Sequence, residues 1–376
     1  MATEIRTTVG ADALVDEHLA GRLVRVVARP VQRGRVPHAV VALSGESGDA
    51  WSVGLGPAEV PDGGPMVRPD AEFFTASVTK LFIVALLLQA HERGEVALDA
   101  SISRYLPAGM ARGLHVLRGV DRTEQVTVRH LASHASGLPD YFERRAGGPS
   151  IRDAMLAGRD ETWGLDEVVA TIRTRQRPHF PPRDLAARGA TARYSDTGFQ
   201  LLIRILEQAC DRGFGALLAE RIARPLGLAS TRPAGGVGAV APLPVYSGSR
   251  RIDVPGLMAS SNDLVSTTAD LIAFGRALRR GEVFDDPRTA RLLTERTRRL
   301  RGLPMRYGLG TMVFRLGRTM TAGRPPLTLV GHSGVSGTWL FWCPELGLTL
   351  AGTVDQVRGQ AIPFRLMARL LHEWRS

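Results

Sequence analysis

Apolar and polar residues alternate in two different ways along the first part of the chain. Apolar side chains three or four positions apart, which share one face of a helix, predict an amphipathic helix over residues 11–28. Two β-rich runs follow, residues 39–43 and 51–55, and the Gly-, Ser- and Asp-rich segment between them predicts a hairpin turn. The N-terminal part is therefore expected to contribute one helix and two antiparallel strands.

The longest apolar run, residues 81–88, belongs to a predicted helix over residues 77–93 that Gly94 ends. This run is far shorter than the roughly 18 residues of a membrane span, so we expect a buried helix. Helix and loop patterns continue to about residue 300. The clearest helical patterns in this part cover residues 165–175, 198–212 and 269–280.

The last quarter of the chain changes to strand-like patterns. Strands are predicted over residues 307–314, 327–330, 337–343 and 348–354, and a last helix over residues 360–374. Trp339 and Trp342 are expected to pack the sheet, with the rim of a pocket as the alternative place for Trp339. Strands at both ends with helices between them predict an α+β fold, with an antiparallel sheet built from both termini.

This pattern also predicts how the chain is organised. Residues 1–75 and 301–376 are expected to form the sheet region, and residues 76–300 a mostly helical region. The two regions are expected to form one catalytic unit with its site at their junction.

Composition and charge exclude some partners. The 376 residues are 44% hydrophobic, enough for a sizeable core, and 48 basic against 37 acidic residues give a net charge of +11. Such a charge raises the question of nucleic acid or an anionic membrane. The basic residues are scattered and aromatic residues do not interleave with them, so we expect neither partner. The densest arginine run, within residues 288–306, is interpreted as the solvated face of a helix, with an anion-binding patch as the alternative.

The cysteines and the N-terminal residues indicate the cellular compartment in which the protein is expected. Cys210 and Cys343 lie far apart without neighbouring ligand residues, so neither a disulfide framework nor a metal site is indicated, and no cofactor is expected. Acidic residues interrupt the apolar positions among the first 28 residues, so no signal-peptide core is recognised. A cytoplasmic protein is therefore expected. The sequence indicates no oligomeric state.

One lysine stands among the 48 basic residues. Lys80 is that lysine, and the other 47 are arginines. An arginine side chain stays protonated inside a protein, whereas the pKa of a lysine shifts readily on burial, so a lysine can move a proton. Ser77 lies three positions earlier at a predicted helix start, so its hydroxyl and the Lys80 amine share one helix face. A Ser–Lys pair is a known nucleophile and base, although S-x-x-K by itself also occurs by chance.

The segment around this pair resembles the nucleophile motif of the serine β-lactamase and penicillin-binding-protein superfamily. Residues 126–139, VTVRHLASHASGLP, are similar to a characteristic stretch of its class C β-lactamase-like branch, as is the segment that follows the nucleophile helix. Tyr194-Ser195-Asp196 stands at the position of the superfamily's Y-x-N motif. His332-Ser333-Gly334 stands at the position of its K-T-G motif. The resemblance spans about residues 35 to 355 and implies a β-lactamase/transpeptidase-like fold.

The resemblance also implies a role for each of these residues. Ser77 would attack a carbonyl carbon and form an acyl-enzyme, while Lys80 and Tyr194 move its proton. The backbone N–H groups of Ser77 and Val335 would form the oxyanion hole. Asp196 and the segment His332, Ser333, Gly334 and Val335 would contact the substrate, and Lys80 would lower the pKa of Tyr194 so that the phenol serves as the base.

Two residues depart from the family pattern. Asp196 replaces an asparagine, so it offers no amide N–H to a substrate and holds Lys80 as a cation. We therefore expect Tyr194 to be the base and β-lactams and peptides to be poor substrates. His332 replaces a lysine, so the positive charge at this place is expected to depend on pH.

These features predict a serine hydrolase that acts on an ester or amide of a small molecule, resembling family VIII carboxylesterases. Acyl transfer to an alcohol or amine, a D,D-peptidase or β-lactamase activity, and a non-hydrolytic ligand-binding or sensor module are the alternatives. Ser333 in a G-x-S-x-G-like segment is rejected as a nucleophile because the fifth position is valine and the β/α alternation is missing. His130 and His134 are interpreted as part of a structural loop under the active site.

Overall fold

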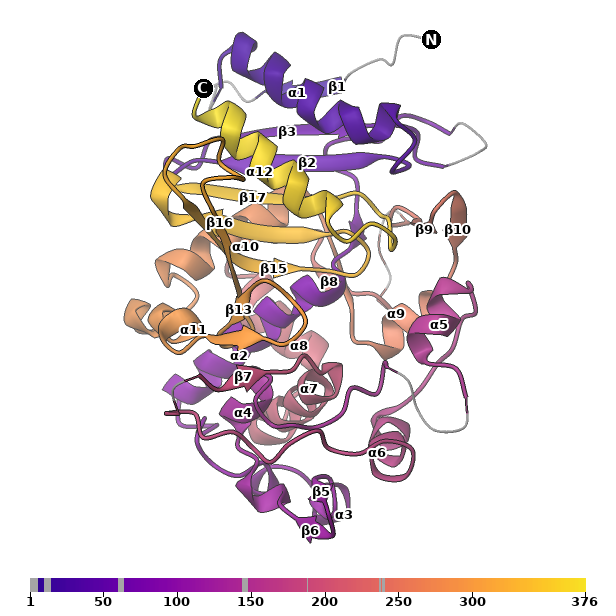
Figure 1. Cartoon of the computed structure of the whole chain (residues 1–376), viewed down its shortest axis with the longest axis vertical. Coiled ribbons are helices and arrows are strands. Elements are labelled where there is room, and N and C mark those ends of the chain that lie inside the picture. The colour runs from indigo at the N-terminus through magenta and orange to yellow at the C-terminus, as the bar shows by residue number, and fades with distance from the viewer. Residues whose placement is uncertain are drawn as a thin grey trace.

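The sheet of the fold brings the two ends of the chain together (Figure 1). The computed structural model describes residues 6–9, 15–59, 64–143, 148–187, 189–236, 238 and 241–376. In their order across the main sheet, the strands are β1 (Arg6–Val9), β3 (Ala50–Leu55), β2 (Ala39–Ser44), β17 (Leu348–Thr353), β16 (Trp339–Cys343), β15 (Leu327–Ser333), β14 (Met312–Leu316), β13 (Arg306–Tyr307), β12 (Arg298–Leu300) and β7 (Thr191–Ala192).

Neighbouring strands in this sheet are antiparallel except for β12 and β7, which run parallel. The N-terminal hairpin joins the C-terminal strands where β2 pairs with β17, with Val41 opposite Gly352. The α+β fold with a sheet built from both termini is thus confirmed. The short strands β7 and β12 come from residues 76–300 and extend the same sheet.

Each face of the sheet carries its own apolar core because side chains alternate along a strand. The helices α1 (Glu17–Gln32) and α12 (Ile362–Trp374) cover one face, and α10 (Thr268–Arg280) lies against the other (Figure 1). Trp339 is buried in the core under α1 and α12, and Trp342 in the core on the α10 side. Both tryptophans pack the sheet as expected, and Trp339 does not line the pocket described below.

Most of the remaining elements form the helical part below the sheet in Figure 1. Its α-helices are α2 (Thr79–Glu92), α3 (Ala108–Ala111), α4 (Val128–Ala132), α5 (Ile151–Leu156), α6 (Leu165–Thr174), α7 (Asp196–Cys210), α8 (Phe214–Leu218), α9 (Pro255–Ser260) and α11 (Leu292–Glu295). Short helical turns are η1 (Ala76–Val78), η2 (Ile102–Arg104), η3 (Thr123–Gln125), η4 (Ala219–Ala223), η5 (Pro287–Arg291) and η6 (Pro344–Leu346). Small sheets pair β4 (Phe73–Phe74), β11 (Leu264–Ser266) and β8 (Arg232–Pro233); β9 (Val245–Ser247) and β10 (Arg250–Ile252); and β5 (Val116–Leu117) and β6 (Val120–Asp121).

The helix α2 lies in the middle of the molecule. Every residue from Thr79 to Ala90 is buried, which explains why this segment is apolar on all sides rather than along one stripe. Lys80 is the one charged residue in that buried stretch. Among the described residues, no helix combines the length and the apolar character needed to cross a membrane.

Several predicted boundaries differ from the structure. The first helix begins at Glu17, where Asp16 caps it; residues 11–14 of the prediction lie outside the described residues. The strand predicted over residues 307–314 is interrupted because Gly308 and Thr311 close a turn in which Gly310 has a φ of +58°. The last helix begins at Ile362, two residues later than predicted.

The arginine-rich run is not the helical face that the sequence indicated. It divides into η5, α11, β12 and β13, and Arg298 is only 7% exposed. The residues after α11 pair with the sheet edge, so strand pairing overrides the local helical pattern. The interpretation of this run as one solvated helix is therefore wrong.

Candidate active site

Ser77 lies in the turn η1 that leads into α2, at a tightly held bend of the backbone. The preceding Ala76 has a φ of +47°, a left-handed conformation that non-glycine residues rarely adopt. Thr75 fixes the bend from the other side, because its N–H donates to the Leu264 carbonyl at 2.8 Å and its hydroxyl to Asp263 Oδ1 at 3.1 Å. The bend thus presents the Ser77 hydroxyl at the start of a buried helix.

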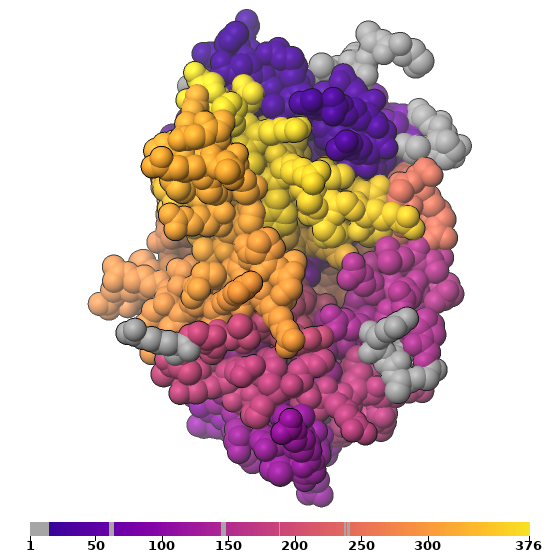
Figure 2. Space-filling model, viewed as in Figure 1, coloured from indigo at the N-terminus to yellow at the C-terminus, as the bar shows by residue number. Residues whose placement is uncertain are grey.

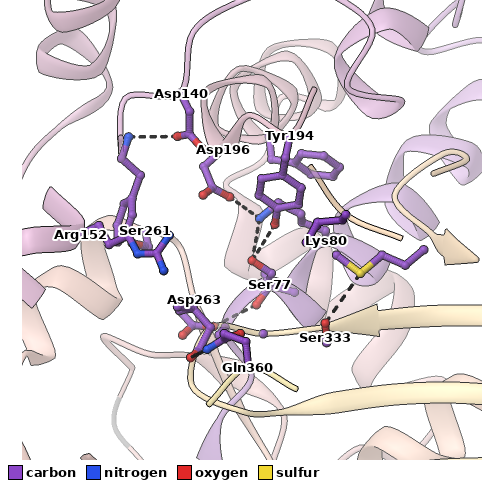
Figure 3. Close-up of a pocket in the computed structure, with 18 of the residues that line it drawn as sticks. Ser77, Lys80, Asp140, Arg152, Tyr194, Asp196, Ser261, Asp263, Ser333 and Gln360 are labelled. Carbon is purple, nitrogen blue, oxygen red and sulfur yellow. Dashed lines mark hydrogen bonds and ion pairs between the residues drawn. The ribbon is translucent and has the colours of Figure 1, made fainter. Parts of the chain in front are cut away.

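Two donors meet at the Ser77 hydroxyl oxygen (Figure 3). Lys80 Nζ donates to Ser77 Oγ at 3.2 Å, and the Tyr194 hydroxyl donates to the same atom at 2.8 Å. Lys80 Nζ also donates to Asp196 Oδ1 at 2.5 Å. The structure therefore brings together all four polar side chains that the sequence assigned to the nucleophile and its neighbours, although 117 positions separate Ser77 from Tyr194.

The Lys80 ammonium is held in its charged form. Burial by itself disfavours the charge, but the attraction of Asp196, followed by that of other nearby groups, outweighs it and leaves the pKa of Lys80 above its ordinary value. The ammonium also lies 5.2 Å from the ring centres of both Tyr194 and Phe199. In this state Lys80 is a proton donor to Ser77.

Tyr194 is also protonated in this arrangement, which contradicts the expectation that Lys80 lowers its pKa. Burial raises the pKa of the Tyr194 phenol well above 10, and repulsion by Asp196 adds to this, while the hydrogen bond to Ser77 opposes it. The sequence showed a cation nearby but not that the phenol is buried beside a carboxylate. Tyr194 is thus a hydrogen-bond donor in the resting site.

His134 supports this site from below, as part of the loop that the sequence predicted. Its ring centre lies 4.3 Å from those of Tyr194 and Tyr307. Its Nδ1 accepts the N–H of Ser195 at 3.2 Å, and burial lowers the pKa of His134 well below 6.5. Sequence reasoning missed Tyr307, for which the only signal was a polar aromatic side chain in a predicted strand.

His332 does not supply a pH-dependent charge to the substrate. It is fully buried behind Ser333, where one ring nitrogen lies 3.0 Å from the Tyr307 hydroxyl and the other 2.9 Å from the Ser333 carbonyl. Burial, with a smaller contribution from Lys80, lowers the pKa of His332 to about 3. The imidazole is therefore neutral across the physiological range, and the expectation of a pH-dependent charge is wrong.

The segment after β15 lies directly against the nucleophile. A Cβ atom added at Gly334 would lie 2.6 Å from Ala76 Cβ and 3.2 Å from Ser77 N, so only glycine lets the two backbones approach this closely. Val335 follows on the pocket lining, and Gln360 Nε2 donates to its carbonyl at 2.8 Å. This approach places the segment that carries Val335 beside Ser77, and the oxyanion hole expected from their backbone N–H groups stays a prediction.

Two buried carboxyl groups near the site were not predicted. Burial, then repulsion by Asp196, raises the pKa of Asp140 well above 3.8. Burial raises the pKa of Asp263 to about 6, although the Leu264 N–H and the hydroxyls of Thr79 and Thr75 donate to its carboxylate. Asp140 directly follows the motif stretch at residues 126–139, which was the one sequence signal for it.

Ser77 lies in the wall of a pocket whose volume is about 760 Å³. Ser77, Lys80, Tyr194, Asp196, Ser333, Gly334 and Val335 line it, whereas His332 does not. Figure 2 shows this face of the molecule hollowed between the yellow C-terminal segment, the orange segment that precedes it and the magenta segment of α5. In the described part of the chain, no three His, Cys, Asp or Glu side chains are grouped to hold a metal ion.

Parts of this chain are similar in sequence to known proteins. Esterase EstB of Burkholderia gladioli is 30% identical over 212 residues, which are 56% of this chain and 50% of EstB. The D-alanyl-D-alanine-carboxypeptidase/endopeptidase AmpH of Escherichia coli K12 is 31% identical over 171 residues, which are 45% of this chain and 39% of AmpH. The matched stretches thus span half or less of these curated relatives.

Comparison of structures and families extends the similarity to nearly the whole chain. A D-stereospecific amidohydrolase from Streptomyces sp. superposes with a TM-score of 0.72 at 25% identity, covering 93% of this chain and 97% of that protein. The expected β-lactamase/transpeptidase-like fold is therefore confirmed. The family model described as Beta-lactamase matches residues 14–370. From this match, together with the geometry around Ser77, we conclude that the protein belongs to the beta-lactamase family.

Proposed function

We propose that the protein is a serine hydrolase that forms an acyl-enzyme on Ser77 and hydrolyses a small-molecule ester or amide, with esters preferred. The observation that carries this proposal is the contact of Ser77 Oγ with both Lys80 and Tyr194 at the wall of an open pocket. A serine hydroxyl is a weak nucleophile until a neighbouring group takes its proton. The site supplies groups that can exchange protons, and backbone donors for the charge that forms on the carbonyl oxygen.

The proton moves first within the Lys80–Asp196 pair. When a substrate covers the pair and removes water from Asp196, whose side chain is 25% exposed, the neutral form of the pair is favoured over the charged one. Lys80 then passes a proton to Asp196 and accepts the Ser77 proton in its place. Ser77 Oγ bonds the carbonyl carbon, and the carbonyl oxygen takes the negative charge near the N–H groups of Ser77 and Val335.

Collapse of this intermediate breaks the bond from the carbonyl carbon to the leaving alcohol or amine. Tyr194 donates its hydroxyl proton to the leaving group, and the proton held by Asp196 returns through Lys80 to Tyr194. Water then attacks the acyl-enzyme by the same steps in reverse, which releases the acid and restores the Ser77 hydroxyl. In this scheme Lys80 with Asp196 is the base, and Tyr194 is the acid for the leaving group.

Esters are favoured over β-lactams and peptides by two features of the pocket. Asp196 stands where an amide N–H donor would meet a peptide carbonyl, and its carboxylate only accepts hydrogen bonds. His332 is neutral and buried, so the K-T-G place offers no cation for a substrate carboxylate. The cavity of about 760 Å³ also has room for an alcohol beside the acyl group, so acyl transfer is the second candidate.

We further propose a reducing, cytoplasmic location. The two cysteines are unpaired, and Cys343 is buried, which suits a compartment where thiols stay reduced. Cell fractionation tests this proposal, because recovery with an extracytoplasmic marker protein would contradict it.

Intact-protein mass spectrometry after brief exposure to p-nitrophenyl acetate, p-nitrophenyl butyrate, a D-alanyl amide and benzylpenicillin tests the reaction. We expect a transient acyl adduct from the esters that maps to Ser77 and is absent in Ser77→Ala. Ser261→Ala is the matched control, because Ser261 lines the same pocket and is outside the proton path. A lasting penicilloyl adduct with no ester turnover would favour a penicillin-binding sensor, and product analysis with added alcohols separates acyl transfer from hydrolysis.

A further inference from the structure

Methionine gathers around the pocket. The chain has nine methionines, and five of them line this cavity. These five are Met155, Met258, Met305, Met312 and Met320. Methionine is flexible and polarisable, so surfaces rich in it adapt to apolar ligands of varied shape.

The apolar lining forms two groups on different elements. The first group, here the helical lobe, comes from the segment after the motif stretch and from α5, α7 and α9, and consists of Phe142, Met155, Ile203, Leu257 and Met258. The second group, here the sheet lobe, comes from residues 303–320 and α12, and consists of Leu303, Met305, Met312, Phe314, Met320 and Phe364.

Ser77 lies between the two lobes. Figure 3 shows Arg152 of α5 and Ser261, which caps the end of α9, on one side of Ser77, and Ser333 on the other. Met312 of the sheet lobe contacts Ser333, whose hydroxyl donates to Met312 Sδ at 3.7 Å. A substrate carbonyl held at Ser77 therefore has an apolar surface on each side.

Two apolar side chains of the sheet lobe are unusually exposed to solvent at the entrance of the pocket. In the described part of the chain, four large apolar side chains are more than 40% exposed, and two of them, Leu303 at 42% and Met320 at 41%, line this pocket. Apolar side chains left open at the entrance of a concave site are typical of contact with an apolar ligand.

The charges around the cavity fit a neutral ligand at its centre. Lys80 is paired with Asp196, and the buried His332 is behind the lining. The lining carboxyls Asp140 and Asp263 are buried, which raises the pKa of both, and Asp263 already accepts hydrogen bonds from Thr75, Thr79 and the Leu264 N–H. The arginines that line the pocket, Arg152, Arg301 and Arg365, are exposed, as is Glu143 beside Phe142. The lobes thus meet the substrate near Ser77, and the exposed charges lie where water reaches them.

We propose that the substrate is a neutral ester whose acyl part and alcohol part are both bulky and apolar, with one part in each lobe. This proposal rests on the proposed ester chemistry at Ser77 and adds the substrate class. Each methylene that leaves water on binding is expected to improve binding about fourfold, until the lobe is filled.

Two ester series test the proposal. In one, the acyl chain of p-nitrophenyl esters is lengthened from acetyl to octanoyl; in the other, the alcohol of butyrate esters is lengthened from methyl to octyl. We expect kcat/KM to rise about fourfold per methylene over the first several methylenes in both series. A flat or falling response in either series, with Ser77 still acylated by p-nitrophenyl acetate, overturns the two-lobe proposal and leaves the hydrolase proposal standing.

One substitution in each lobe tests whether the lining of that lobe causes the dependence of kcat/KM on chain length. Met258→Gln in the helical lobe and Met320→Gln in the sheet lobe keep the side-chain size and make it polar, while Met258→Leu and Met320→Leu are matched apolar controls. We expect each glutamine variant to weaken the chain-length dependence of one series and each leucine variant to retain it. If the glutamine and the leucine variant at one position both lose the chain-length dependence of kcat/KM, the assignment of that lobe is contradicted. It is also contradicted if both variants retain the dependence.

Equilibrium binding measures the contribution of the lobes to affinity without the reaction at Ser77. Ser77→Ala cannot be acylated, so calorimetry with the butyrate esters measures binding alone, and its dissociation constant should fall with alcohol length. A constant dissociation constant overturns the proposal even where no turnover is found. Tighter binding of half-esters of dicarboxylic acids than of neutral esters of equal length also overturns it, because the exposed arginines would then select the substrate.

Discussion

Lys80 Nζ and Asp196 Oδ1 form an ion pair of 2.5 Å one hydrogen bond away from the nucleophile. The pair joins the first turn of α2 to the first residue of α7, two segments 116 positions apart. Its attraction keeps the Lys80 ammonium charged against the effect of burial. In the proposed reaction the first step is a proton transfer inside this pair, and Asp196 is one of the two residues that depart from the family pattern.

Replacing Asp196 with asparagine tests this role. The amide cannot take a proton from Lys80, so we expect kcat/KM for alkyl esters to fall roughly a hundredfold or more, the usual effect of losing a general base. The same change restores an amide donor, so acylation by benzylpenicillin should increase. Steady-state kinetics and adduct mass spectrometry measure the two effects.

Glu143→Gln is the control for this prediction. Glu143 is another carboxylate on the lining, it pairs with Arg193, and it has no contact with Lys80. The control should keep the parental rate on esters and penicillin. Unchanged ester turnover and unchanged penicillin acylation in Asp196→Asn would falsify the proton path through this residue.

Tyr194→Phe tests the assignment of the phenol as the acid for the leaving group. A p-nitrophenolate ion leaves without a proton, whereas an alkoxide does not, so the variant should lose far more activity on alkyl esters than on p-nitrophenyl esters. We expect a difference of at least tenfold between the two losses. Equal losses on both ester types would instead indicate that Tyr194 acts in the attack by Ser77, as the base that the sequence suggested.

Gly334→Ala tests the backbone approach that forms the expected oxyanion hole. The added methyl group would lie 2.6 Å from Ala76 Cβ and 2.9 Å from the Thr75 carbonyl oxygen, so the segment carrying Val335 must move away from Ser77. We expect kcat to fall by about 10² to 10³, the range measured on losing one oxyanion donor, with a smaller change in KM. Stopped-flow acylation by p-nitrophenyl acetate measures the step directly.

Gly109→Ala is a suitable control for that variant. Gly109 lies in α3, and a Cβ atom there would have no neighbour within 4 Å. It should leave kcat unchanged. A Gly334→Ala enzyme with normal acylation would show that the Val335 N–H is not one of the donors.

The sequence predicted the parts of the site that depend on local spacing or on motifs. Ser77 and Lys80 are three positions apart at a helix start, which by itself places their side chains on one face. Tyr194 and Asp196 are far away in the chain, and only the family resemblance connected them to the nucleophile. The apolar helix over residues 77–93 and most of the terminal strands followed from uninterrupted patterns, whereas the strand predicted over residues 307–314 is divided by a turn.

The directions of the pKa shifts could not be predicted from the sequence. Whether Tyr194 and His332 gain or lose protons depends on burial and on which charges face them, and these are properties of long-range contacts. The hydrogen bond between His332 and Tyr307 joins two strands that are separated in the sheet by β14. For the same reason, the pairing of β12 and β13 turned an arginine-rich run that resembles a helix into part of the sheet edge.

The burial of His332 leads to a last prediction, which concerns the pH dependence of the free energy of unfolding. The pKa of His332 is about 3 in the folded protein and about 6.5 when exposed, so between these values the unfolded chain binds a proton that the folded chain does not. Its contribution to stability is complete above pH 6.5 and is lost progressively as the pH falls towards 3. Asp263, with its pKa raised to about 6, acts in the opposite direction, because its contribution is lost as the pH rises from 3.8 to 6.

His332→Asn isolates this contribution. The asparagine does not titrate, so the loss of unfolding free energy between pH 7.5 and pH 5.5 should be smaller than in the parent by about 1 to 1.5 kcal/mol. Its stability at pH 7.5 should also be lower, because the contact with Tyr307 is lost. Urea unfolding at the two pH values measures both effects, with the exposed His18→Asn as the control that should keep the parental pH dependence. An equal pH dependence in His332→Asn and the parent would mean that His332 is already protonated inside the fold, and the buried site would then carry a second cation next to Lys80.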